Sequence, residues 1–122
     1  MHDGIEALKR RTKQFALDVL ACMRAHPYPE DTRNVRQQLI RSATSTGANY
    51  RAACRARSRA EFIAKIGVAL EEADESAFWL ELLIESSSVT NPTVRILLAE
   101  ANELSAILAT SARTARANAT AK

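Results

Sequence analysis

Two pairs of glutamates have a spacing that could serve metal chemistry. Glu72 precedes Glu75 by three residues and Glu100 precedes Glu103 by three, so each pair would share one face of a helix. Four-helix proteins that hold two iron ions use a Glu-x-x-His pair directed into the core. Here a second glutamate replaces the histidine, and both histidines lie elsewhere, one near the start of the chain and one in a predicted loop. We therefore predict no metal site and expect these carboxylates on a solvated face.

The residue sets of covalent catalysis are also missing from the sequence. A serine or cysteine nucleophile needs a base positioned beside it, and no Ser/His/Asp or Cys/His arrangement is evident. A buried carboxylate cluster around Lys65 remains a catalytic alternative, although charges paired on a solvated face explain the same residues more simply. We predict that the protein is not an enzyme and uses no cofactor.

Residues 41–58, RSATSTGANYRAACRARS, raise the alternative of a phosphate-binding loop. The Gly-x-x-x-x-Gly-Lys-Ser/Thr arrangement of such a loop is absent, and no strand precedes the segment. Apolar and small residues instead recur at spacings of three and four from Val35 to Ala53, which indicates a helix. Gly47 costs about 1 kcal/mol relative to alanine inside a helix. We interpret the small residues as permitting a neighbouring helix to approach closely.

The positions of the helix breakers divide the chain into four helical segments. The chain of 122 residues has the length of one domain, and we predict a single domain over residues 1–122. Four helices joined by short links predict an all-α fold, an antiparallel up-down-up-down four-helix bundle. The predicted helices cover about residues 3–25, 32–56, 58–87 and 92–117, followed by a frayed C-terminal tail.

Local signals mark three of the four helix starts. Thr32 is the predicted N-cap of the second helix. Ser58 and Glu61 form a capping box at the third, and Pro92 stands at the first helical position of the fourth. The apolar stripes predicted to face the core run from Ile5 to Met23, from Val35 to Ala53, from Phe62 to Ile84 and from Val94 to Ala112.

The cysteines and the apolar runs indicate the cellular compartment in which we expect the protein. Cys22 and Cys54 are the only cysteines and do not form a CxxC pair, which is typical of a reducing compartment. We interpret both as small packing residues. No apolar run approaches the ~20 residues of a membrane span, and the first residues lack the apolar stretch of a signal peptide. We expect a cytoplasmic protein with no membrane association.

The third and fourth helices carry more apolar surface than one bundle needs. On a helical wheel, Phe78 and Trp79 point away from the predicted core, which suggests a contact surface. The alternative is an irregular bundle in which the tryptophan lies under a loop. We predict an interface between subunits, and its candidate residues are Arg41, Val68, Glu71, Glu75, Phe78, Trp79, Leu82, Ile96 and Ile107.

Charge is distributed unevenly along the chain. Residues 1–59 hold twelve Lys/Arg and five Asp/Glu, whereas residues 60–104 hold two Lys/Arg and nine Asp/Glu. A basic face on the second helix and acidic faces on the third and fourth are complementary. Between identical chains such faces make a head-to-tail contact, which closes into a ring where the rotation permits. Pairing within one chain is the alternative.

The sequence also resembles a known bacterial family. The start ALKRRTKQFALDVL, the centre QLIRSATSTGANYRAACRARSRAEFIAKIGVALEEADESAFWLELLIES and the end EANELSAILATSARTAR are similar to four-helix-bundle proteins encoded in intervening sequences of 23S ribosomal RNA genes. The resemblance implies an antiparallel bundle that assembles as a homopentameric ring. Its most specific parts are Arg41-Ser42, Gly47-Ala48-Asn49-Tyr50, Phe62-Ile63-Ala64-Lys65, Glu72-Ala73-Asp74-Glu75 and Trp79-Leu80-Glu81-Leu82.

A related branch adds an expectation about function. The accessory variability determinant proteins of diversity-generating retroelements have a similar bundle and pentamer, and bind a reverse transcriptase and nucleic acid through a basic surface. We predict a non-enzymatic oligomer that binds structured RNA or DNA, chiefly through phosphates. Few aromatic residues are available for a single-strand stacking platform. The candidate residues are Lys9, Arg10, Lys13, Arg33, Arg36, Arg51, Arg55, Arg57 and Arg59.

Two alternatives to this function stay open. The arginines could form a solvated face together with subunit contacts. The bundle could instead be an adaptor or scaffold ring that docks a partner protein and has no role with nucleic acid.

Overall fold

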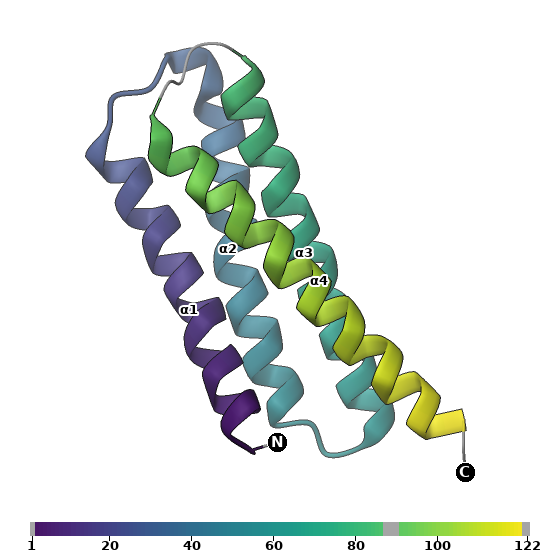
Figure 1. Cartoon of the computed structure of the whole chain (residues 1–122). Helices are drawn as coiled ribbons and strands as arrows, with labels where there is room; N and C mark the ends of the chain where they lie inside the picture. Colours follow the sequence, from purple (N-terminus) through teal and green to yellow (C-terminus); the bar gives the residue numbers. More distant parts are fainter. Residues whose placement is uncertain (1, 87–90, 121–122) are drawn as a thin grey trace.

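Four long helices pack side by side in the computed structural model, which describes residues 2–86 and 91–120 (Figure 1). Over these residues the protein contains no strand. The chain rises through one helix and descends through the next, so its two ends lie at the same end of the bundle (Figure 1). The all-α fold expected from the sequence is confirmed, with α1 at His2–Ala25, α2 at Arg33–Cys54, α3 at Arg59–Glu85 and α4 at Pro92–Thr120.

The apolar period of each helix forms the core. Phe15 and Val19 of α1 are buried, and so are all six predicted stripe positions of α4: Val94, Leu97, Ala101, Leu104, Leu108 and Ala112. Burying one side chain of this size stabilises the fold by about 1.5–3 kcal/mol. The prediction that Ile5 faces the core is wrong, because 43% of this residue is exposed. It lies in the first turns of α1 and lines an open groove with Tyr50 and Ile107, so one side of it faces water.

The small-residue segment of α2 packs against α1. A Cβ atom added at Gly47 would lie 3.3 Å from the backbone oxygen of Thr12, tighter than ordinary van der Waals contact. Ser42 and Thr46, on the same stripe, are fully buried. The prediction that this segment is helical and permits a close approach is confirmed.

The helix starts follow the predictions in part. The Ser58 hydroxyl accepts a hydrogen bond from the Glu61 backbone N–H at 3.0 Å, as a capping residue should. Thr32 stands at the N-cap of α2, but its hydroxyl donates to the carbonyl of Pro29 at 2.7 Å and caps nothing. The reason is a 3₁₀ turn, η1 (Glu30–Thr32), which precedes α2 and directs that hydroxyl backwards.

The C-terminal tail differs from the prediction. We expected fraying from about residue 117, but α4 continues to Thr120. Alanines recur through its last turns, and alanine has the highest helix propensity of all residues. None of the helices that the structure describes has the combined length and apolarity needed to span a bilayer.

Both cysteines pack as small residues. Cys22 is buried, and Cys54 is half-buried. The Tyr28 hydroxyl donates to the Cys22 carbonyl at 3.1 Å, and the Asn91 amide donates to the Cys22 sulfur at 3.6 Å. This cluster joins the link after α1 to the residue before α4. Burial and the neighbouring thiol raise the pKa of Tyr28, so its hydroxyl stays protonated and can donate.

Candidate nucleic-acid interface

The first glutamate pair is bound by an arginine of the same chain. Arg41 of α2 donates to the two carboxylate oxygens of Glu72 at 3.0 and 3.3 Å, and to Glu75 at 2.6 Å. Glu72 is buried, which corrects the expectation that these carboxylates lie on a solvated face. Burial disfavours its charged form, but the hydrogen bonds from Arg41 and Ser45 outweigh burial and lower the pKa of Glu72.

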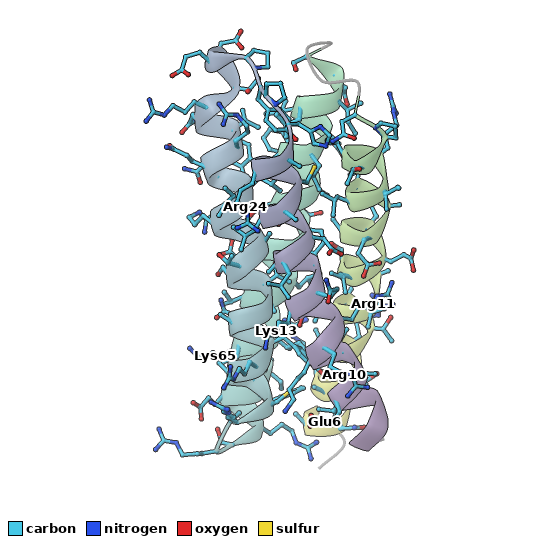
Figure 2. All side chains as sticks on the ribbon, turned by 90° about the vertical axis from the view of Figure 1, so that its left-hand side faces the viewer. Glu6, Arg10, Arg11, Lys13, Arg24 and Lys65 are labelled. Atoms are coloured by element: carbon cyan, nitrogen blue, oxygen red, sulfur yellow. The ribbon has the colours of Figure 1, made fainter. Side chains whose placement is uncertain are left out.

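The second glutamate pair repeats this arrangement between α1 and α4. Arg11 donates through Nε to Glu100 at 2.7 Å, and through Nη2 to Glu100 and Glu103 at 2.8 Å. Figure 2 shows Arg11 directed from α1 towards α4. These hydrogen bonds raise the pKa of Arg11 further above its ordinary value, which fixes it as a permanent cation.

We call each of these arrangements an arginine clamp: one joins Arg41 to Glu72 and Glu75, and the other joins Arg11 to Glu100 and Glu103. The clamps explain the glutamate spacing that could have served a metal. Each clamp ties two helices together through charge-assisted, bidentate hydrogen bonds. Across the described part of the chain, no group of three or more His, Cys, Asp or Glu residues is placed to hold a metal ion. Lys65, the centre of the catalytic alternative, makes no ion pair with either glutamate pair in that part.

The interface candidates separate into exposed, half-buried and internally paired residues. Arg41 and Glu75 bind each other, so part of the charge complementarity is satisfied within one chain. Trp79 is half-buried and packs against the core together with Ile107. Its indole N–H is buried and has no hydrogen-bond partner among residues 2–86 and 91–120. The candidates that remain exposed are Val68, Glu71, Phe78, Leu82 and Ile96.

Four of the nine basic candidates have partners within the chain. Lys9 pairs with Glu6 at 2.7 Å, and Arg33 and Arg57 have weak ion pairs at 3.5 and 4.0 Å. Arg36 lies over the ring of Tyr28, 5.4 Å from its centroid, and donates to Thr32. The candidates with neither an ion pair nor another side-chain partner in the described part of the chain are Arg10, Lys13, Arg51, Arg55 and Arg59.

The five unpaired candidates lie at one end of the bundle, where α1 and α3 begin and α2 ends. Three further cations that sequence reasoning missed belong to this group, because Lys65 lies in the first turns of α3, and Arg113 and Arg116 lie in the last turns of α4, which also ends there. Figure 2 shows Arg10, Lys13 and Lys65 over this half of the molecule. We call the group the basic end: Arg10, Lys13, Arg51, Arg55, Arg59, Lys65, Arg113 and Arg116.

The two ends of the bundle differ sharply in charge. The segments 4–13, 44–69 and 106–119 form the end at which the chain starts, and they carry eleven Lys/Arg against two carboxylates, Glu6 and Glu61. The segments 18–40 and 77–86 with 91–99, at the opposite end, carry four Lys/Arg against five carboxylates. Unpaired cations gathered at one end of a molecule attract the phosphates of a nucleic acid.

Comparison with known proteins places the chain in a family. The family model of the 23S rRNA-intervening sequence protein matches residues 7–110. The structure is similar to that of a protein with unknown function from the S23 ribosomal protein family of Bacteroides thetaiotaomicron. The two are 32% identical, the match covers 86% of this chain and 97% of that chain, and the TM-score is 0.71. No curated protein matches the chain. The chain therefore belongs to the 23S rRNA-intervening sequence protein family.

Proposed function

We propose that this protein is a non-enzymatic, cytoplasmic oligomer of four-helix bundles that binds structured nucleic acid through the basic end. One observation carries the proposal. Eight cations from all four helices gather without an ion pair at one end of the described structure, where Lys/Arg far outnumber carboxylates, whereas the opposite end has nearly equal numbers of the two. A folded chain that leaves so many like charges together loses stability through self-repulsion, and a polyanion relieves that repulsion.

Phosphate contacts of this kind predict a steep dependence on salt. The logarithm of the binding constant falls by roughly 0.9 per phosphate contact for each tenfold rise in salt. If all eight cations of the basic end made contact, the slope would be about −7 for each protomer. Such binding has little preference for base sequence, because phosphates are the same in every sequence.

Exposed apolar residues support the assembly of several chains. Ile96 is 66% exposed and Phe78 is 50% exposed, and Val68 and Leu82 are further exposed apolar side chains. A contact between subunits would remove them from water, which stabilises an assembly. The family resemblance implies a ring of five. Several basic ends on one ring would strengthen weak binding through avidity.

The same exposed apolar side chains favour a second candidate function. A partner protein could cover Phe78 and Ile96 in place of another copy of this chain. In this adaptor function, the purified protein would be a ring or a monomer that carries no nucleic acid.

Native mass spectrometry after purification at moderate salt, without nuclease, tests the proposal. We expect a ring of about five chains carrying heterogeneous nucleic acid that high salt removes. A clean ring that also fails to bind an RNA hairpin would favour the adaptor, and a monomer would refute the assembly.

Charge reversal locates the interface. We expect the double variant Arg51→Glu/Arg55→Glu to abolish hairpin binding in fluorescence anisotropy while its circular dichroism spectrum stays unchanged. The variant Arg24→Glu/Arg33→Glu removes the same charge at the opposite end and is the matched control. Equal losses in both variants would show that net charge, and not the basic end, governs binding.

A further inference from the structure

A pocket of about 540 Å³ opens at the basic end between the start of α3 and the last turns of α4. Its volume lies within the range of small-molecule sites, about 300–1,000 Å³. The helices that form it approach each other from segments far apart in the sequence (Figure 1). Arg59, Phe62, Ser111, Thr114 and Asn118 line it.

The lining combines one aromatic face with free polar groups. Phe62 is half-buried and packs against the core, so its ring is held in place. The side chains of Ser111, Thr114 and Asn118 make no hydrogen bond within the part of the chain that the structure describes. The neighbouring Thr110 differs, because its hydroxyl donates to a backbone carbonyl at 3.1 Å and accepts from an arginine at 3.3 Å.

Charge identifies the kind of occupant. Arg59 is exposed at the pocket and has no ion pair among the described residues. An apolar occupant would leave this guanidinium and the three free polar side chains without partners. A nucleotide has a flat base that stacks on an aromatic ring, a base edge that exchanges hydrogen bonds with hydroxyls and amides, and a phosphate that pairs with arginine.

We propose that this pocket holds one unpaired nucleotide of the nucleic acid that the basic end binds, an inference that rests on the proposed function. The base stacks on Phe62, its edge meets Thr114 and Asn118, and Arg59 pairs with a flanking phosphate. A base inside a perfect duplex cannot reach the ring, so the occupant comes from a bulge or a loop. One aromatic ring serves one base, which agrees with the shortage of aromatics for a whole single strand.

A matched pair of RNA hairpins tests the proposal on the full-length protein. One hairpin has a fully paired stem, and the other carries a single bulged adenosine in the same stem. We expect the protein to bind both, and to bind the bulged hairpin about five- to 150-fold more tightly, which is the usual contribution of one stacked base.

Two variants separate the pocket from the fold. Phe62→Leu keeps an apolar side chain against the core but removes the stacking face. Ala115→Phe fills the pocket, because Ala115 also lines it. Ala106→Phe is the control, since Ala106 is an exposed alanine of α4 that does not line the pocket. We expect the first two variants to bind both hairpins with the affinity that wild type shows for the paired one, and the control to behave as wild type.

The possible failures point to different conclusions. If wild type binds both hairpins equally, or if Phe62→Leu and Ala115→Phe retain the preference for the bulge, the pocket proposal is wrong and the proposed function stands. If wild type binds neither hairpin at low salt, both the proposed function and the pocket proposal are wrong.

Discussion

Replacing Arg41 by methionine should destabilise the protein strongly, and in a way that depends on pH. The variant keeps a long apolar side chain but leaves Glu72 without its two hydrogen bonds from the guanidinium. Only 11% of the Glu72 side chain is accessible to water, so solvent cannot replace the lost partner well. Stranding a fully buried charge costs about 3–5 kcal/mol.

Partial exposure reduces the magnitude expected for Arg41→Met. About half of the Arg41 side chain, 47%, is exposed, so water already screens part of the interaction. We therefore expect a loss of about 2 kcal/mol at pH 7 in urea unfolding, measured at one fixed protein concentration because the proposed assembly would also stabilise the fold. A loss of this size lowers Tm by roughly 6–10 °C in a domain of this length.

The sign of the pH dependence follows from the pKa of Glu72. In the wild type that pKa is lowered, so Glu72 contributes stability above the pH at which an unfolded glutamate titrates, about 4.3. That contribution disappears as the pH falls through the folded pKa. In the variant, Arg41 no longer opposes the effect of burial, so the pKa of Glu72 is raised. Once Glu72 is protonated, it is neutral and no buried charge destabilises the fold. The difference between wild type and Arg41→Met should therefore be largest near pH 7 and shrink below about pH 4.

Two controls decide whether this reasoning holds. Arg11→Met breaks the other clamp, where 27% of the Glu100 side chain is accessible, and should cost less than Arg41→Met. The double variant Arg41→Met/Glu72→Met removes both charges and should recover most of the stability. Equal losses for the two single variants, or a loss that stays constant between pH 7 and pH 4, would refute the claim that a stranded Glu72 causes the effect.

Three further perturbations have expected outcomes. Gly47→Ala should destabilise the protein by about 1 kcal/mol or more in chemical denaturation, because the new Cβ presses on the Thr12 carbonyl. In Gly67→Ala the new Cβ meets no atom within 4 Å, so this variant should be more stable by up to about 1 kcal/mol. A change of the same sign in both variants would contradict the packing argument. Ser58→Ala should cost about 1 kcal/mol by losing the cap on α3, with Ser58→Asp, which can still cap, as the control in the same assay. Trp79→Ala should reduce the oligomer to smaller species in light scattering, and an unchanged mass would remove Trp79 from the interface.

The periodicity of the sequence was enough to predict the helices and most of the core. Leu104 and Leu108 are buried because apolar residues that recur every 3.6 residues lie on one face of the helix. That apolar face packs into the core, away from water. Ile5 fits the same period but lies at the end of the bundle, where a pattern along one helix cannot show whether a neighbour covers it. Thr32 has the right residue type for a cap, and the turn before it changed what its hydroxyl does.

The candidate site depended on contacts between helices, which sequence spacing shows poorly. Arg41 and Glu75 were assigned to a surface between chains, yet they meet because α2 and α3 are neighbours in one chain. Lys65 was missed because it lies in the acidic segment 60–104, and Arg113 was missed because it is far along the chain from the other basic candidates. They join the basic end only once the start of α3 and the end of α4 are placed together.

The two clamps also set an order in which the bundle opens. Arg41 and Glu72 are 31 residues apart in the chain, whereas Arg11 and Glu100 are 89 apart. Closing the longer loop costs about 0.9 kcal/mol more in chain entropy. The α1–α4 side is also less filled, with a groove of about 690 Å³ between the two helices. Helix α1 should therefore be the last element to join the bundle and the first to leave it, and hydrogen exchange should be faster at its amides than at those of α2 and α3.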